Sequence, residues 1–264
     1  LPISNLLDTI YNNIRTLIIG VMYPSKDLGL YNKGKSFPWL IIENINSTIN
    51  SVLLPTMSMA QDNTETLKAM TRRSIKISIY IISPLMMGLF FVAKPLISLL
   101  LTDKWLLCVP YMRIFCITYM LYPIQTANLN AILANGRSDI FLKLEILKKI
   151  IGITFLLISM KINVMAIAYS LVITTIISTI INALPNKKLL NYGYREQIRD
   201  ILPALLLSLF MGGVVLLWTF MDMNNILILI CQVITGAVIY VLGSNLLKLE
   251  SYTYIIDTIR SFKK

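Results

Sequence analysis

Residues 201–247 read ILPALLLSLFMGGVVLLWTFMDMNNILILICQVITGAVIYVLGSNLL, and Asp222 is the one charged residue among them. A helix needs about 20 predominantly apolar residues to cross the hydrocarbon core of a bilayer. The charge-free runs 201–221 and 223–247 each reach that length. The stretch predicts two membrane-spanning helices and favours an all-α integral membrane protein.

Similar runs recur along the chain. Residues 114–136 and 162–186 carry no charge, and the runs 44–61 and 77–93 are slightly shorter. The segments that open the chain and precede residue 160 are interrupted by polar residues. Together the runs predict about eight transmembrane helices, at residues 3–23, 37–60, 75–101, 107–135, 142–160, 163–184, 201–221 and 224–247.

The composition argues against a soluble enzyme. The chain has 264 residues, of which 56% are hydrophobic and 14% charged, and its mean hydropathy is +0.71. Soluble domains carry about 25% charged residues. The absence of histidine excludes imidazole catalysis and His-ligated metals within this chain. No phosphate-binding loop or Cys-x-x-Cys pair occurs, so we expect no enzyme activity, no metal and no cofactor. Cys108, Cys116 and Cys231 are expected to be small buried hydrophobes.

The basic residues predict the orientation in the membrane. The connections after the second, fourth and sixth spans, together with the C-terminal tail, hold sixteen lysines and arginines, whereas the opposite connections hold five. The positive-inside rule therefore places the C-terminus and the loops near Arg72, Lys148 and Lys187 in the cytoplasm, with Lys33 and Lys104 outside. This distribution accounts for the formal charge of +11 without a nucleic-acid partner.

Polar residues inside three spans mark a candidate substrate cavity. Four of them recur on one face of the first span, four on one face of the second, and the fourth span carries three more. They are Asn5, Asp8, Asn12 and Arg15, then Glu43, Asn46, Ser47 and Asn50, then Arg113, Gln125 and Asn128. Polar side chains at membrane depth usually face a bundle interior or a hydrated cavity.

Two interpretations of these polar faces remain open. The side chains could join helices through hydrogen bonds, or they could line a cavity that accepts sugars and phosphates. Arg15 is the best placed partner for a phosphate, because a guanidinium binds phosphate oxygens in bidentate fashion. Asp8 and Glu43 are candidate ion-coupling sites, since burial favours their protonated forms. Six prolines in or beside the first four spans favour helices that can bend: Pro38, Pro55, Pro84, Pro95, Pro110 and Pro123.

Several motifs resemble one transporter family. They are LGLYNKG (28–34), VLLPTMSMAQDN (52–63), SPLMMGL (83–89), AKPLISLLLTDKW (93–105), NGRSDIFLKLEILKK (135–149) and PNKKLLNYGYREQIRD (185–200). In order and spacing they are similar to the polysaccharide-transport branch of the multidrug/oligosaccharidyl-lipid/polysaccharide flippase superfamily, which includes lipopolysaccharide, O-antigen and teichuronic-acid type flippases. The resemblance extends from residue 1 to about residue 215.

The resemblance implies two lobes of six helices around a central cavity, often with two extra helices. This chain would match the second lobe (1–185), a cytoplasmic connection (186–200), and two extra helices with a basic tail (201–264). Family members move undecaprenyl-pyrophosphate-linked oligosaccharides across the bacterial inner membrane by alternating access. The first lobe is missing from the sequence, so the chain looks N-terminally truncated and should not transport alone. The implied partners are a lipid-linked oligosaccharide, membrane lipid and the missing lobe.

Two other functions compete with a flippase. A drug exporter of the same superfamily should line its cavity with acids and aromatic residues, whereas these faces are rich in amides and carry an arginine. A membrane-embedded polymerase or ligase for lipid-linked sugars should display catalytic acids on a sizeable outer loop. The predicted outer loops offer little beyond Asp27, Asp103 and Asp222 in short turns.

Overall fold

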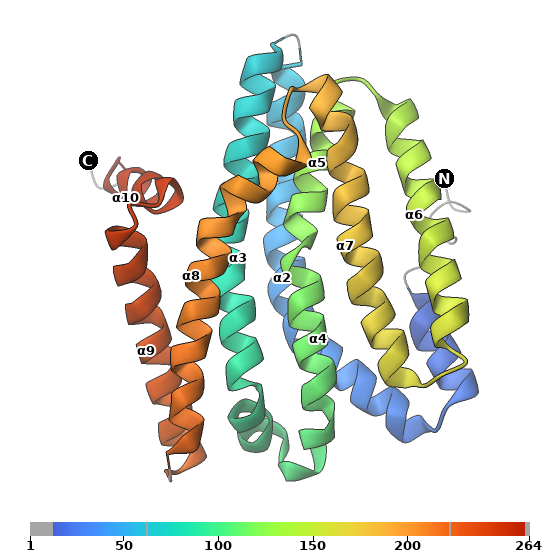
Figure 1. Cartoon of the computed structure of the whole chain (residues 1–264), viewed down its shortest axis with the longest axis vertical. Helices are drawn as coiled ribbons and strands as arrows, with labels where there is room; N and C mark the ends of the chain where they lie inside the picture. The colour runs from blue at the N-terminus through green and yellow to red at the C-terminus, as the bar shows by residue number, and fades with distance from the viewer. Residues whose placement is uncertain (1–12, 62, 222, 262–264) are drawn as a thin grey trace.

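A computed structural model describes residues 13–61, 63–221 and 223–261 as a helical bundle (Figure 1). The described residues contain no strand, which confirms the all-α class. The helices are Asn13–Met22, α2 (Ser25–Met59), α3 (Thr64–Leu101), α4 (Val109–Met120), α5 (Tyr122–Ala134), α6 (Ser138–Ser159), α7 (Val164–Leu189), α8 (Tyr194–Leu217), α9 (Asn225–Leu246) and α10 (Glu250–Ser261), with short 3-10 segments at Asp103–Cys108 and Trp218–Phe220.

Within the described residues, each of the eight predicted spans overlaps a helix, and residues 3–12 of the first span lie outside the described residues. Five helical segments are long and apolar enough to cross a membrane: Thr64–Leu101, Asp103–Ala134, Val164–Leu189, Tyr194–Phe220 and Asn225–Leu246. The helices α2 and α6 do not meet that measure. Uncharged amides and hydroxyls lower the hydropathy of α2, whereas charged residues interrupt α6. The chain is a multi-pass membrane protein, and the count of eight spans is approximate.

Several boundaries differ from the prediction; α3 begins at Thr64 rather than at position 75, and α8 at Tyr194 rather than at position 201. The helix α2 begins at Ser25, well before position 37, because no helix-breaking residue follows Pro24 until the interior Pro38. The fourth span is divided at Leu121, and Pro123 lies in the first turn of α5, where its missing N–H costs nothing. Residues 250–261, predicted as part of a tail, form the helix α10.

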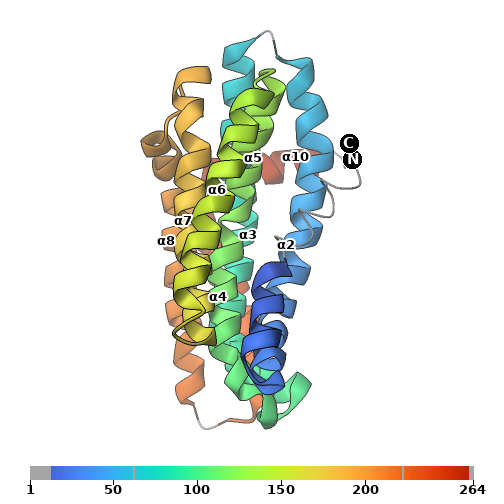
Figure 2. The same ribbon diagram turned by 90° about the vertical axis from the view of Figure 1, so that its right-hand side faces the viewer.

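The arrangement places the last two long helices at one edge of the bundle. In Figure 1, α8 and α9 stand beside α3, while α6 and the first helix lie at the opposite edge. Turning the molecule by 90° shows α2 on one side of the bundle and α6, α7 and α8 on the other (Figure 2). The helix α10 lies across the direction of α9 rather than continuing it (Figure 1).

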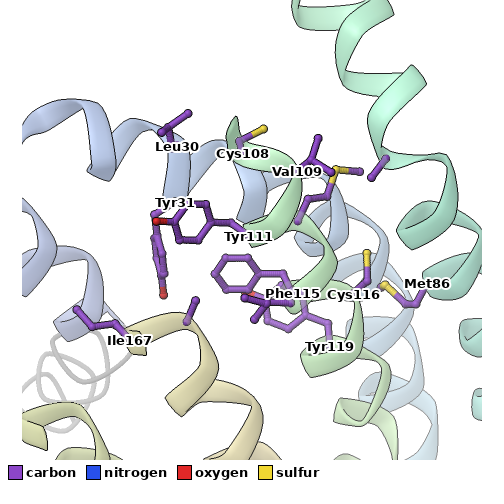
Figure 3. Packing of buried hydrophobic residues seen from close by; sticks show 14 of the residues in the cluster. Leu30, Tyr31, Met86, Cys108, Val109, Tyr111, Phe115, Cys116, Tyr119 and Ile167 are labelled. Carbon is purple, nitrogen blue, oxygen red and sulfur yellow. The ribbon is translucent and has the colours of Figure 1, made fainter. Parts of the chain in front are cut away.

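Aromatic side chains fill the core between α2 and α4. The rings of Tyr31 and Phe115 meet edge to face with centroids 5.1 Å apart, and Phe115 lies 5.5 Å from Tyr119 (Figure 3). Such geometries are favoured by the quadrupoles of aromatic rings. Cys108 and Cys116 are buried and unbridged, as predicted, whereas Cys231 is only partly buried. This core holds α2 against α4 beside the cavity described next.

Candidate cavity of the lobe

A cavity of about 560 Å³ lies between the first helix, α2, α4, α5, α6 and α7. We call it the lobe cavity. Four basic residues line it, from three different helices, and Glu145 is the one acid among its lining residues. The basic residues are Arg15, Lys35, Lys148 and Lys149. An excess of fixed positive charge in a partly enclosed space favours an anionic ligand.

Arg15 differs from the other basic residues of the cavity in its hydrogen bonding. Its Nε atom is buried and has no hydrogen-bond partner among the described residues. A buried guanidinium normally has its donors satisfied, since an unpaired buried polar group is costly. Arg15 therefore lines the lobe cavity with a guanidinium whose buried Nε–H has no hydrogen-bond acceptor among the described residues.

The remaining basic residues differ in how they are paired. Lys148 donates to Glu145 at 2.5 Å within α6, and its side chain is only 12% exposed. The Lys35 Nζ atom lies 5.6 Å from the centre of the Trp39 ring, one helical turn away on α2. The site thus contains one neutralised lysine and at least one lysine held by a cation–π contact.

An aromatic wall faces these cations. The Trp39 side chain is 37% exposed, and its ring meets Tyr119 edge to face at 5.5 Å. Tyr119 in turn lies 5.0 Å from Tyr122. Threonine and serine hydroxyls on α5 and α7 complete the lining, at Thr126, Thr174, Thr175 and Ser178. Aromatic faces beside hydroxyl groups suit a ligand with both apolar and hydroxyl-bearing surfaces.

The structure brings only some of the predicted site residues to this cavity. Arg15 and Gln125 line it, and Gln125 also donates to the Thr175 carbonyl oxygen (3.3 Å) and the Thr179 hydroxyl (3.2 Å). Asn5, Asp8 and Asn12 lie outside the described residues.

Two amides of the second polar face join α2 to α5. Asn46 accepts a hydrogen bond from Thr126 (2.9 Å), and Asn50 accepts one from Asn130 (2.8 Å). Glu43 and Ser47 are exposed on the outer side of α2 instead. The second polar face is therefore divided between contacts with α5 and an open surface.

Asn128 and Arg113 lie elsewhere. Asn128 is fully buried and exchanges two hydrogen bonds with Gln197, at 2.9 and 2.8 Å, and it accepts a third from Asn186 at 2.7 Å. This amide cluster ties α5 and α7 to the first turn of α8. The Arg113 Nε donates to the Phe90 carbonyl oxygen at 3.2 Å, and its guanidinium lies 5.3 Å from the Phe90 ring centre.

Sequence reasoning missed the three lysines of the cavity and Trp39. In the sequence all three lysines count with the connections, because basic residues near the ends of spans serve to predict the orientation. Two signals were present in the sequence: Trp39 follows Lys35 by four residues, and Lys148 follows Glu145 by three. Residues at these spacings share one face of a helix.

Comparisons with known proteins agree with the resemblance drawn from the motifs. Residues 1–110 match a family described as polysaccharide biosynthesis protein. The chain is 23% identical over 221 residues to the lipopolysaccharide biosynthesis protein WzxC of Escherichia coli, covering 80% of this chain and 45% of that protein. It is 25% identical over 137 residues to the teichuronic acid biosynthesis protein TuaB of Bacillus subtilis, covering 52% and 28%.

A solved structure shares the fold. The lipid II flippase MurJ, in an inward closed conformation, superposes with a TM-score of 0.77 at 18% sequence identity, covering 96% of this chain and 54% of MurJ. The chain spans about half the length of these proteins or less. These findings agree with the resemblance to the polysaccharide-transport branch, and the chain shares the fold of about half of MurJ.

Proposed function

We propose that this chain, with its resemblance to the polysaccharide-transport branch, is the C-terminal half of a flippase for lipid-linked oligosaccharide. The flippase moves undecaprenyl-pyrophosphate-linked glycan across the bacterial inner membrane by alternating access, for lipopolysaccharide or another surface polysaccharide. The observation that carries the proposal is the unpartnered Arg15 Nε in a cavity with three further basic residues.

Electrostatics supports an anionic substrate in this cavity. A pyrophosphate that enters a low-dielectric region is costly unless fixed cations accompany it. Arg15 supplies a bidentate partner, and Lys35 supplies a compact charge beside it. The same positive wall disfavours a drug exporter for cations, because like charges repel in a poorly screened space.

The aromatic wall supports a sugar next to that pyrophosphate. The half-exposed Trp39 ring presents an apolar face, and the hydroxyls of Thr174 and Ser178 can exchange hydrogen bonds with sugar hydroxyls. In this proposal Gln125, Asn46, Ser47, Asn50, Arg113 and Asn128 either contact the glycan or hold the helices that do. Glu43, on the open side of α2, is the candidate ion-coupling residue among those described, and Asp8 is a second.

The open side of α2 supports a missing partner lobe. Eight polar residues in the second span are exposed: Glu43, Asn44, Ser47, Thr48, Asn50, Ser51, Thr56 and Ser58. Contact between such polar side chains and lipid is energetically unfavourable. In the proposed division, residues 1–185 form the second lobe, 186–200 a cytoplasmic connection, and 201–264 the two extra helices and tail. The N-terminal lobe of the full-length protein covers the polar side of α2.

Glycan export in cells tests this function. In the full-length protein, Arg15→Ala should reduce export by at least about tenfold, the loss expected for one charge-assisted contact to phosphate. Arg15→Lys keeps the charge but loses the bidentate geometry, so it should retain more export than Arg15→Ala. Membrane abundance is quantified in parallel. Normal export by Arg15→Ala at equal abundance would refute the pyrophosphate assignment.

A further inference from the structure

A second basic site lies far from the lobe cavity, at the end of the bundle where α10 meets α3. A hollow of about 530 Å³ is lined there by four basic residues of α3, Lys68, Arg72, Arg73 and Lys76, with Glu65, Glu250 and Tyr254. We call it the α10 basin. Its lining carries four cations and two carboxylates, and two further carboxylates of α8, Glu196 and Asp200, pair with cations of the basin.

Three of these cations already have acidic partners. Arg72 makes two hydrogen bonds with Asp200, at 2.8 and 2.7 Å. Lys68 lies 3.3 Å from Glu196, and Lys76 forms an ion pair with Glu250 of α10. These contacts fix the positions of α8 and α10 against α3.

Arg73 is different. Its guanidinium lies over the Tyr254 ring, 4.8 Å from the centre, and no carboxylate among residues 13–61, 63–221 and 223–261 pairs with it. Stacking uses the flat face of the guanidinium and leaves its edge N–H donors free to bind oxygen. Arg73 is thus oriented in the basin with its hydrogen-bonding capacity unused.

An apolar groove continues directly from the basin. It has a volume of about 370 Å³ and runs between α2 and α3, lined by Ile49, Val52, Leu53 and Met70 among others. Arg73, Ile77 and Tyr254 line both the basin and the groove, so the two are contiguous. A hollow in which the Arg73 guanidinium has no acidic partner among the described residues, and which opens into an apolar groove, matches a ligand with an anionic head and an apolar tail.

The depth of the basin matches the headgroup region of a bilayer. The 22 residues of α9 span about 33 Å, enough to cross the hydrocarbon core, and the chain then turns at Lys248, whose φ is 49°. The helix α10 crosses the direction of α9 at that level (Figure 1). Its apolar residues Tyr252, Ile255, Ile256 and Ile259 recur at the spacing of one helix face, which is typical of a helix lying in the interface.

From this arrangement we infer that the α10 basin and its groove bind an anionic phospholipid of the bilayer. The phosphate oxygens accept hydrogen bonds from Arg73, the tyrosine hydroxyl of Tyr254 closes the headgroup site, and one acyl chain follows the groove between α2 and α3. Basic pockets at helix ends favour anionic headgroups in this way. The bound lipid joins α10 to α2, with which it otherwise has little contact. This inference does not depend on the proposed transport function.

Lipid retention by the purified full-length protein tests the inference. Native mass spectrometry measures the apparent Kd for dioleoyl-phosphatidylglycerol and for dioleoyl-phosphatidylcholine in detergent. We expect clear preference for the anionic lipid, and Arg73→Ala should raise its Kd by at least about tenfold, as for one lost charge-assisted contact. Arg195→Ala is the matched control, because Arg195 is an exposed basic residue in the first turn of α8 that lines neither hollow.

A second variant tests the groove independently of the headgroup. Val52 is 63% exposed, so Val52→Trp can fill the groove without disturbing the core, and it should also weaken phosphatidylglycerol binding. Equal retention of both lipids would overturn the inference. Displacement by inorganic phosphate without any effect of Val52→Trp would identify a free-phosphate site, and preferential displacement by undecaprenyl phosphate would identify a carrier-lipid site. Either result would overturn the inference, while Arg15 and glycan export would remain a separate question.

Discussion

At the scale of single residues, Gly34 decides how closely α2 approaches α4. A Cβ atom at this position would lie 2.6 Å from the Tyr111 Cβ, 2.8 Å from the Met112 nitrogen and 2.9 Å from the Cys108 carbonyl oxygen. Two of these atoms belong to the backbone, so the helices would have to separate. We expect Gly34→Ala to destabilise the protein by about 1–3 kcal/mol, the range typical of overpacking. Thermal unfolding in detergent measures this, with Gly29→Ala as the control, because nothing lies within 4 Å of a Cβ there.

The amide cluster around Asn128 predicts a structural rather than a transport defect. Asn128→Ala removes the partner of two buried side chains, Gln197 and Asn186, at a cost of about 1–3 kcal/mol for each group left unpaired. We expect lower membrane abundance with unchanged export per molecule. Reduced export per molecule at normal abundance would instead mean that Asn128 contacts the substrate, as the sequence had suggested.

Two tryptophans with similar surroundings should respond differently to substitution. The Lys33 Nζ lies 5.6 Å from the Trp105 ring centre, as Lys35 does from Trp39, but only Trp39 lines the lobe cavity. We expect Trp105→Phe to preserve glycan export. Trp39→Leu should reduce export about fivefold, the effect of losing roughly 1 kcal/mol of ring contact. The comparison is made in cells at matched membrane abundance, and equal export by the two variants would contradict a sugar contact at Trp39.

At the scale of helices, the long apolar helices could be predicted from the sequence, but the positions at which helices break could not. The helices α8 and α9 follow from residues 201–247 because their length and composition leave no alternative in a bilayer. The break between α4 and α5 is harder to predict, since Pro123 can either kink a helix or begin a new one. The helix α10 was not predicted because its 12 residues are too few to span a bilayer, although the helical spacing of Tyr252, Ile255 and Ile259 was present in the sequence.

The lining of the lobe cavity could not be fully predicted from the sequence, for a related reason. Lys35 and Lys148 fall in segments that the charge pattern assigned to connections, and only the packing of α2 and α6 around α4 and α7 brings them together. Arg15 and Gln125 could be predicted because they lie inside apolar runs, where a polar residue stands out. Charged residues near the ends of spans do not stand out in this way, because their neighbours in the sequence are also polar.

The distribution of basic residues predicts the helix orientation, and this prediction can be tested directly. We expect a cysteine at position 104 to react with a membrane-impermeant reagent added to the periplasm, and a cysteine at position 187 to react only after the membrane is permeabilised. Cys108, Cys116 and Cys231 are first replaced, so that the introduced cysteine is the only target. The reverse labelling pattern would invert the proposed topology.

At the scale of the whole molecule, the chain resembles one half of a transporter. It covers 54% of MurJ and leaves polar residues of α2 exposed at membrane depth. We expect this chain expressed alone to insert without exporting glycan, and export to return when the N-terminal half of the full-length protein is supplied as a separate polypeptide. Glycan export in a strain that lacks the full-length gene measures both. Export by the chain alone would show that one lobe suffices.

The length of α2 and α3 has a mechanical consequence. At 35 and 38 residues they extend over about 52 and 57 Å, well beyond the roughly 30 Å of hydrocarbon. Both helices therefore extend beyond the bilayer, and both contain prolines, Pro38 and Pro55 in α2 and Pro84 and Pro95 in α3. A rotation of a rigid helix about its middle displaces its ends more than its centre. In the proposed alternating access, a small rotation of the lobe would therefore move the helix ends near residues 59–64 farther than the lining of the lobe cavity.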